Sequence, residues 1–527
     1  MATTTAQTTL ATVLIIHLAI LAMAQKPTED LDSTTGEYVV GFRNYEKEDP
    51  TRSYKRLYDW DNRITVRPIS ISLWFPAEMM SAKSANDKMK VKDYMTILKQ
   101  EEEWESLPDD RILSWFYYAD NEKNRTQFEI ETKAYRDAEA AKGRFPVVIY
   151  APSYQASSTE NFALCEFIAS HGYIVISSPS RGTENRFLDG GTTRDIETQA
   201  RDIEFLIAES TSLTNADADK LCVIGFSFGG ISNVLAQIRN KRIKALLCLD
   251  GSIKYQFPKL LSSSYADISK VDVPFMFMSQ KDIPLSVMIE DNIDTTLNRN
   301  FAFFDSLKHS QAYYLKFNDL THSYFSSMGV LFQERDGRQD KSNRQIIASY
   351  NWVKIYSLHF LNAFLKGDKT SMRYLDTDPI DNGVPPGLIS VKIKEPIAHP
   401  MSFEDFNELA RSQEYKNLEE LVKKLKNENP GIQLEEWKFN NLGLQLLFQG
   451  NVQEGINILS LNTILYPNSA NAFDSLAEGY LIQGNEDLAI KNFDLSLALD
   501  PHNQNAITRL KQLKTKQKKE NNAWENK

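Results

Sequence analysis

The stretch KLCVIGFSFGG, residues 220–230, largely decides which fold the sequence predicts. Its apolar first half is typical of a strand that is buried on both faces of a parallel sheet. Its second half contains the pattern Gly-x-Ser-x-Gly, centred on Ser227, and the residues from there to Arg239 are compatible with a helix. Strand, tight turn and helix in this order predict that Ser227 projects above one edge of a sheet.

The residue types in this turn suit a nucleophilic serine. Side chains two positions before and after the serine would not fit in so tight a turn, which explains Gly225 and Gly229. The N-terminus of the following helix offers free N–H groups that can stabilise a developing oxyanion. We therefore interpret Ser227 as the nucleophile of an acyl-transfer enzyme.

The segments on both sides of this turn show the same alternation of strand and helix. Short apolar runs separated by helix-compatible segments are typical of a doubly wound α/β domain with a mostly parallel sheet. The runs are 146–152, 173–179, 220–227, 244–250, 273–279 and 311–317. Residues 68–75 alternate like a further strand, whereas helical spacing within 78–140 predicts a helical insertion. We assign residues 25–365 to this domain.

A serine hydroxyl is activated by a base, and an acid orients that base. In this kind of domain the three residues follow in the chain order serine, acid, histidine. His322 is the candidate base, because it lies just past the last apolar run. His309 precedes that run, and His359 has helical neighbours. Two acids compete: Asp250 ends the strand after the nucleophile unit, and Asp282 follows the next strand. Spacing leaves both open.

The C-terminal part of the chain changes to an all-α pattern. Residues 366–400 lose periodicity and collect proline and glycine, which predicts a linker. We expect a helical connector at 401–436, a repeat domain with a final capping helix at 437–517, and a disordered tail at 518–527.

Two repeats are visible in this C-terminal part. Gln-Gly-Asn at 449–451 recurs 34 residues later at 483–485. The segment resembles tetratricopeptide repeats, which implies helical hairpins at 437–470 and 471–504. Because two such repeats bury little apolar surface alone, we expect the connector helices or the catalytic domain to cover their open face.

The N-terminus carries an export signal. Residues 10–24, LATVLIIHLAILAMA, have the length of a signal-peptide core and end in small residues that suit signal peptidase. We expect cleavage before Gln25, which removes the signal peptide 1–24 and leaves an exported protein, periplasmic or secreted, without a stable transmembrane span. An uncleaved anchor is the alternative, because no Lys or Arg precedes the apolar run.

Composition excludes several classes of function. The 527 residues carry 60 Lys and Arg against 70 Asp and Glu, a net charge of −10, so we expect no nucleic-acid partner. The cysteines, Cys165, Cys222 and Cys248, are too few for a disulfide framework and are predicted to be buried. No zinc spacing appears among them and the seven histidines, so we expect no metal and no cofactor.

The block PVVIYAPSYQASSTENFALCEFIASHGYIVISSPSRG, residues 146–182, with the later GFSFGG and LDG, resembles the platelet-activating-factor acetylhydrolase group and its dienelactone-hydrolase-like bacterial relatives. The resemblance implies an α/β-hydrolase fold. It also implies that the acid is the Asp of the Leu-Asp pair after the nucleophile helix, which favours Asp250 over Asp282.

The same resemblance implies an oxyanion hole at the backbone N–H groups of Tyr154 and Phe228. The sequence differs from the family there, because Pro152-Ser153 replaces the usual His-Gly pair of the loop.

Together these features predict an exported serine hydrolase that cleaves carboxylic esters of a small-molecule or lipid-like substrate. The helical-repeat module would dock a protein partner or brace the enzyme. A serine peptidase or amidase, which would use the same triad, is one alternative. An interaction scaffold with a vestigial hydrolase domain is the alternative from a different class.

Overall fold

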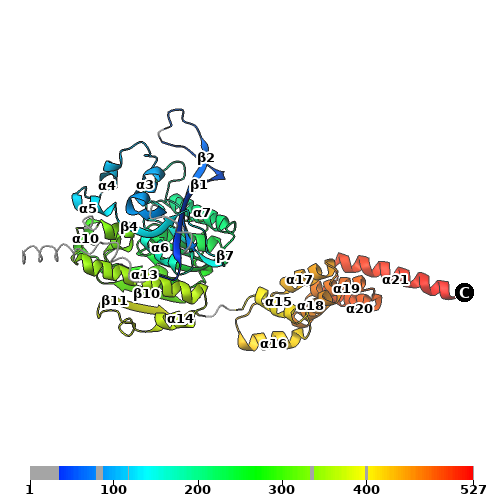
Figure 1. Cartoon of the computed structure of the whole chain (residues 1–527). Coiled ribbons are helices and arrows are strands. Elements are labelled where there is room, and N and C mark those ends of the chain that lie inside the picture. Colours follow the sequence, from blue (N-terminus) through cyan, green and yellow to red (C-terminus); the bar gives the residue numbers. More distant parts are fainter. Residues whose placement is uncertain are drawn as a thin grey trace, which may run out of the picture. The chain divides into compact units, whose positions relative to one another are not determined.

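The computed structural model describes residues 35–57, 59–78, 87–116, 118–332, 337–397 and 401–525, with side chains as far as residue 516. The predicted signal peptide lies outside these residues. The chain forms two compact units, divided between Ile397 and Ala398 (Figure 1).

The first unit is built on one mixed sheet. Its strands are β1 (Val39–Tyr54), β2 (Thr65–Ala77), β3 (Lys88–Lys90), β4 (Glu131–Arg136), β5 (Phe145–Ala151), β6 (Ile174–Ser177), β7 (Ala216–Phe226), β8 (Ile243–Leu249), β9 (Phe275–Ser279), β10 (Ala312–Phe317) and β11 (Ile389–Lys394). The order across the sheet is β11-β10-β9-β8-β7-β5-β6-β2-β1-β4-β3. Strands β5 to β10 are parallel, and β2 and β11 pair antiparallel at the two sides of this group.

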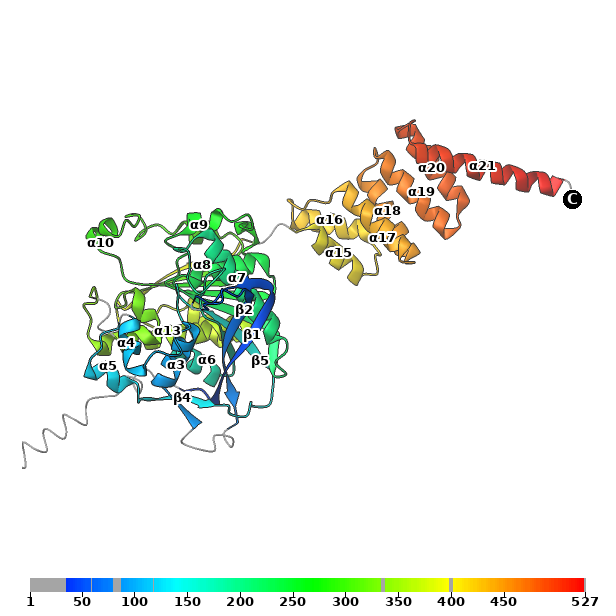
Figure 2. The same ribbon diagram turned by 90° about the horizontal axis from the view of Figure 1, so that it is seen from above.

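Helices cover both faces of this sheet, as Figure 2 shows for α7, α8 and α9 on one side and α3, α6 and α13 on the other. The helices of the unit are α3 (Val91–Glu101), η3 (Asp109–Arg111), α4 (Ile112–Trp115), α5 (Glu122–Gln127), α6 (Phe162–Ser170), α7 (Thr193–Ser210), α8 (Gly229–Arg239), α9 (Phe257–Leu261), η4 (Ile268–Lys270), α10 (Leu285–Glu290), α11 (Ala302–Ser306), η5 (His322–Phe325), α12 (Ser327–Leu331), α13 (Asn343–Leu365) and α14 (Lys369–Asp376).

The apolar runs of the sequence are the central strands of the sheet. Every residue of β5 is buried, and so is every residue of β9, because helices pack on both faces there. Two hydrophobic cores result, one on each face of the sheet. The first unit is therefore a doubly wound α/β domain.

The helical insertion predicted at 78–140 is only partly helical. It contains α3, α4 and α5, but also β3 and β4, which extend the sheet beyond β1. In β4 only Thr132 and Ala134 are buried, so its alternation is short and its other residues are polar or charged. Because β4 lies near the edge of the sheet, between β1 and the short edge strand β3, it lacks the apolar run that marked the central strands.

The linker predicted at 366–400 is wrong for most of its length. Residues as far as Ile397 belong to the first unit, which therefore extends beyond the predicted end at residue 365. Asp368 caps α14 by accepting hydrogen bonds from the N–H groups of Thr370 and Ser371, and β11 pairs along the whole of β10. The prolines and glycines of this segment flank β11 instead of interrupting it, as an edge strand allows.

The second unit is entirely helical in its described residues. Its helices are α15 (Phe403–Ser412), α16 (Leu418–Glu428), α17 (Glu436–Phe448), α18 (Val452–Leu465), α19 (Ala470–Gln483), α20 (Glu486–Leu499) and α21 (Gln504–Glu525). The helix pairs α17–α18 and α19–α20 occupy the two predicted repeats. The recurring glycines, Gly450 and Gly484, both have positive φ, 87° and 86°, in the turns that end α17 and α19.

The connector helices cover one end of these hairpins. Phe403 and Phe406 of α15 pack edge-on against Phe439 of α17, with ring centroids 4.9 and 5.2 Å apart. At the other end, α21 continues to Glu525, although a disordered tail was predicted from residue 518. The Lys, Glu and Ala residues of that segment are good helix formers, which accounts for the difference.

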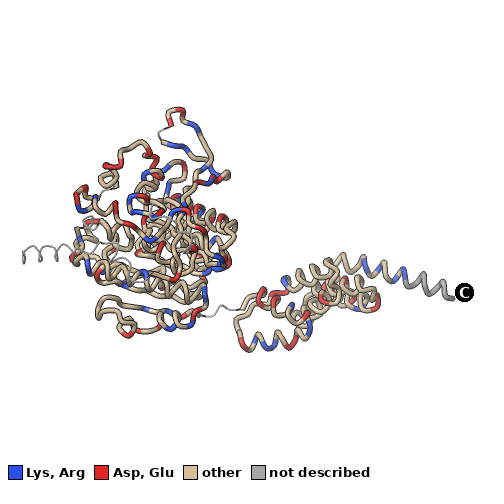
Figure 3. The backbone as a smooth tube through the Cα atoms, in the orientation of Figure 1, with Lys and Arg blue, Asp and Glu red and all other residues tan. Residues whose placement is uncertain are grey.

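Lys and Arg residues are interspersed with Asp and Glu residues along the chain in both units (Figure 3). Among the described residues, no helix has the length and apolar character that a membrane span requires. The three cysteines are buried and free, as predicted.

Candidate active site

Ser227 lies in the turn between β7 and α8 and has a φ of 51°, in the left-handed region that L-residues rarely adopt. Its N–H donates to the carbonyl of Leu249, and its carbonyl accepts from the N–H of Ser252, at 3.1 and 2.7 Å. These bonds to the end of β8 hold the strained turn in place.

The two glycines of the motif have no room for a side chain. A Cβ at Gly225 would lie 2.2 Å from the carbonyl oxygen of Gly229. A Cβ at Gly229 would lie 2.1 Å from the carbonyl oxygen of Ala151, at the end of β5. The glycines are therefore required by the close approach of the turn to its own helix and to the neighbouring strand.

The structure brings Ser227, His322 and Asp250 together in one hydrogen-bonded chain. The Oγ of Ser227 lies 2.9 Å from Nε2 of His322, and Nδ1 of His322 lies 2.6 Å from Oδ2 of Asp250. Because an ionised carboxylate only accepts, Nδ1 carries the proton and Nε2 is free to accept from the serine hydroxyl. The Asp250 side chain is fully buried, whereas that of His322 is 41% exposed and accessible from solvent.

The competing acid, Asp282, is not part of this chain. Its carboxylate pairs with Nζ of Lys316 at 3.1 Å, and its side chain is 56% exposed. Of the two acids that spacing left open, the structure places Asp250 beside the imidazole.

Two further residues donate hydrogen bonds to the acid, Tyr255 through its side chain and Gln280 through its backbone N–H. Asp250 Oδ1 accepts from the Tyr255 hydroxyl at 2.9 Å and from the Gln280 N–H at 3.1 Å. Burial, together with the negative charge of Asp250, raises the pKa of Tyr255 well above its ordinary value, so the phenol keeps its proton and donates. Below His322, the ring of Phe226 is stacked at a centroid distance of 5.2 Å.

The two residues predicted for the oxyanion hole lie next to each other. The rings of Tyr154 and Phe228 meet edge to face with centroids 5.8 Å apart. Phe228 directly precedes α8, so its N–H lies at the positive end of that helix. Among the described residues, neither backbone N–H donates to a hydrogen-bond acceptor, which leaves both available to a ligand.

The loop that carries Tyr154 is held from both sides despite its unusual Pro152-Ser153 sequence. The Ser153 N–H and hydroxyl donate to the two carboxylate oxygens of Glu160 at 2.9 and 2.5 Å. The amide of Gln199 donates to the Pro152 carbonyl at 2.9 Å. The Tyr154 hydroxyl donates to the carbonyl of Leu188 at 3.1 Å.

Tyr255, Gln280 and Glu160 were not predicted from the sequence. No rule of sequence spacing predicts these residues, because the contacts that they make form only in the folded chain. Gln280 did carry a weak signal, since it directly follows β9. Within the described ranges, no group of three or more His, Cys, Asp or Glu residues could hold a metal ion.

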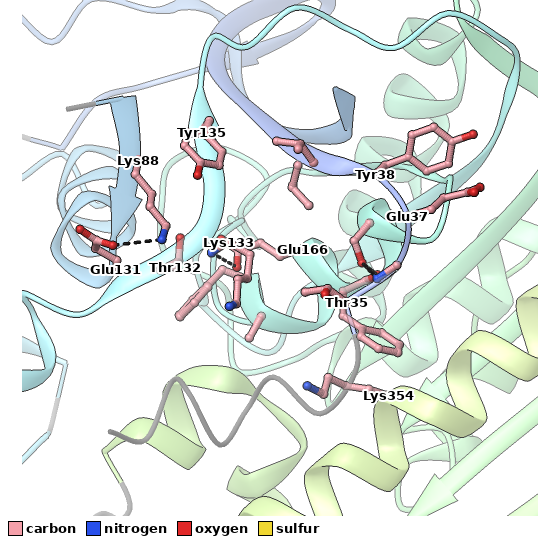
Figure 4. Close-up of a pocket in the computed structure, with 17 residues that line it drawn as sticks. Thr35, Glu37, Tyr38, Lys88, Glu131, Thr132, Lys133, Tyr135, Glu166 and Lys354 are labelled. Atoms are coloured by element: carbon pink, nitrogen blue, oxygen red, sulfur yellow. Dashed lines mark hydrogen bonds and ion pairs between the residues drawn. The ribbon is translucent and has the colours of Figure 1, made fainter. Parts of the chain in front are cut away.

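A separate pocket of 330 Å³ lies beside β1, β4 and α6 (Figure 4). Its lining includes none of Ser227, His322 and Asp250. Its buried carboxylate, Glu166, accepts from the Tyr94 hydroxyl at 2.6 Å and from the Lys133 N–H at 3.0 Å. Burial raises the pKa of Glu166. Both of its oxygens have partners, which indicates a structural role.

The fold and the arrangement of Ser227, His322 and Asp250 on the carboxyl edge of the sheet define an α/β hydrolase. A family model described as "PETase: PET hydrolase-like" matches residues 131–333, which include all three side chains. The match supports an ester hydrolase of the serine-hydrolase type.

Among solved structures, a ferulic acid esterase from Streptomyces cinnamoneus is similar to this chain. It has 16% sequence identity and a TM-score of 0.48, with 69% of this chain and 99% of that chain covered. No curated protein matches the sequence.

Proposed function

We propose that this protein is a serine hydrolase that cleaves carboxylic esters through a covalent acyl-enzyme. The observation that carries the proposal is the unbroken chain from Ser227 through His322 to the buried Asp250, with distances of 2.9 and 2.6 Å. The matching family model, described as PET hydrolase-like, supports an ester as the substrate.

In the first half of the reaction, His322 Nε2 takes the proton of Ser227 while the serine oxygen attacks the ester carbonyl carbon. The C–O bond to the alcohol then breaks, and the imidazolium returns its proton to the leaving alkoxide. Asp250 holds the imidazole in the required tautomer and stabilises its charged form. In the second half, His322 takes a proton from water while the water oxygen attacks the acyl carbon. The bond between that carbon and the Ser227 oxygen then breaks, the imidazolium returns its proton to the serine oxygen, and the carboxylic acid leaves.

The tetrahedral intermediates carry a negative oxygen that needs donors. We assign this role to the N–H groups of Tyr154 and Phe228, which have no other acceptor among the described residues. One such donor typically contributes about 10²–10³ in rate.

We propose that residues 1–24 direct export, that the substrate is a small or lipid-like ester, and that the second unit is a tetratricopeptide-like module that docks a partner or braces the enzyme. The recurrence of Gln-Gly-Asn at the ends of two equivalent helices supports the repeat assignment.

The test is hydrolysis of p-nitrophenyl acetate and butyrate by four proteins: wild type, Ser227→Ala, Asp250→Asn and Asp282→Asn. We expect the first two substitutions to lower kcat/KM by about 10³-fold or more. Asp282→Asn is the matched control, because it removes the same charge from an exposed ion pair, and it should retain activity within about twofold.

Turnover by Ser227→Ala equal to that of wild type, or equal losses in the two Asp variants, would contradict the assignment. The same proteins assayed on aminoacyl p-nitroanilides separate the esterase from the amidase alternative, since an amidase would turn over the anilides efficiently.

A further inference from the structure

Gln280 occupies a position between the acid and the base. It directly follows β9, which lies between β8, the strand directly before Asp250, and β10, the strand that leads to His322. A side chain at the end of β9 can therefore reach both neighbours.

Gln280 makes hydrogen bonds to both neighbours and to Tyr255. Its backbone N–H donates to Oδ1 of Asp250 at 3.1 Å. Its side-chain Oε1 accepts the backbone N–H of His322 at 3.1 Å, and its Nε2 donates to the Tyr255 hydroxyl oxygen at 3.2 Å. Tyr255 in turn donates to Oδ1 of Asp250 at 2.9 Å.

The chemistry of the groups in this cluster determines which of them donates and which accepts in each hydrogen bond. The single proton of Tyr255 goes to the carboxylate of Asp250, so the phenol oxygen can only accept from Gln280. The backbone N–H of His322 requires an acceptor. A side chain at residue 280 must therefore present one acceptor and one donor together, which an amide provides and a carboxylate or a thioether does not.

The charged groups around the cluster do not replace these bonds. Lys254 Nζ donates to Ser279 Oγ and to the Tyr314 hydroxyl, at 3.2 and 3.0 Å. Lys281 pairs with Asp340, and Asp282 pairs with Lys316.

We infer that Gln280 is a positioning residue of the active site. Its side-chain oxygen holds the backbone of His322 at the start of the turn, and its side-chain NH₂ group holds the Tyr255 hydroxyl, which in turn holds the carboxylate of Asp250. In this way Gln280 keeps His322 and Asp250 in a fixed position relative to each other. The inference rests on the proposed function for its catalytic consequence. Gln280 itself does not touch the reacting atoms.

The test compares Gln280→Met, which keeps the length of the side chain and removes both amide bonds, with wild type. The matched control is Gln237→Met, because the buried Gln237 also donates through its amide, to Lys270 and Asp272, but on α8 away from the triad. With p-nitrophenyl butyrate, we expect Gln280→Met to lower kcat by about 10- to 100-fold with KM unchanged. Gln237→Met should retain kcat within about twofold even if both variants lose thermal stability.

A double-mutant cycle tests whether Gln280 acts through Tyr255. Because Gln280 acts partly through Tyr255, the effects of Gln280→Met and Tyr255→Phe on kcat should be clearly less than additive. Fully additive effects, or a kcat of Gln280→Met within twofold of wild type, would overturn the inference.

A second readout needs no turnover. In protein with ¹³C-labelled histidine, the Cε1–H resonance of His322, assigned with His322→Ala, should shift in Gln280→Met and stay in place in Gln237→Met. If wild type shows neither ester turnover nor labelling by a fluorophosphonate, the proposed function fails. An unchanged His322 resonance in Gln280→Met would separately overturn the positioning role.

Discussion

Ser227 and Asp250 both hold a backbone conformation that L-residues rarely adopt, with φ of 51° and 40°. They directly follow the neighbouring strands β7 and β8, and the N–H of each donates a hydrogen bond to a residue of the next strand. Ser227 donates to Leu249, and the Asp250 N–H donates to Met278 at 2.6 Å. Such strained residues persist only where the surrounding structure determines them, and here that structure is the packed carboxyl edge of the sheet.

The turn at Ser227 makes a prediction for Gly229→Ala. The new Cβ would lie 2.1 and 2.6 Å from the carbonyl group of Ala151, which is backbone and cannot rotate away. We expect a loss of about 2–4 kcal/mol in the free energy of unfolding, measured in urea, and a loss of ester turnover. Gly337→Ala is the control, since its Cβ would meet no atom within 4 Å. Equal stability of the two variants would contradict this account of the turn.

The sequence predicted the three side chains that the structure brings together and missed the residues that hold them in place. Ser227 and His322 were found from motif and chain order, and Asp250 was preferred over Asp282 by resemblance. Gln280 and Tyr255 belong to different segments and meet only across the strand order of the folded sheet. A single sequence contains no information on such pairs.

Among the elements, strand prediction succeeded where helices bury both faces of the strand and failed at the two edges of the sheet. The central strands are continuous apolar runs, such as β5, in which all residues are buried. In contrast, β11 has one buried residue, Ile389, and three partly or fully exposed charged or polar ones, Ser390, Lys392 and Lys394. Edge strands expose charge, which removes the apolar pattern by which strands are recognised.

The pairing of β11 with β10 predicts how truncated chains behave. A chain that ends at residue 365 lacks β11, which pairs antiparallel along β10 from Ala312 to Phe317. We expect its uncovered edge to cause aggregation, whereas a chain that ends at residue 397 stays monodisperse. Size-exclusion chromatography of the two proteins checks this, and a monodisperse 25–365 protein would show that β11 is dispensable.

The whole molecule consists of two units with separate hydrophobic cores. The cores on the two faces of the sheet contain residues of the first unit, and the clusters around Phe439, Phe493 and Leu459 contain residues of the second. Because the described residues share no core cluster between the units, each has the buried surface to fold by itself.

This division predicts that residues 25–397 retain the ester turnover of the full chain within about twofold. Turnover on p-nitrophenyl butyrate and the thermal midpoint of the two proteins are the measurements. An unchanged turnover favours a docking role for the second unit. A truncated protein that unfolds or loses activity would favour bracing and would contradict the independence of the units.

The central claim is that the Ser227 hydroxyl is activated by the His322 imidazole, and labelling with a fluorophosphonate followed by peptide mass spectrometry tests it most directly. The account predicts one modified residue, Ser227, with labelling lost in Ser227→Ala, strongly slowed in His322→Ala and unchanged in Asp282→Asn. A label on another residue, or full labelling of the Ser227→Ala protein, would contradict it.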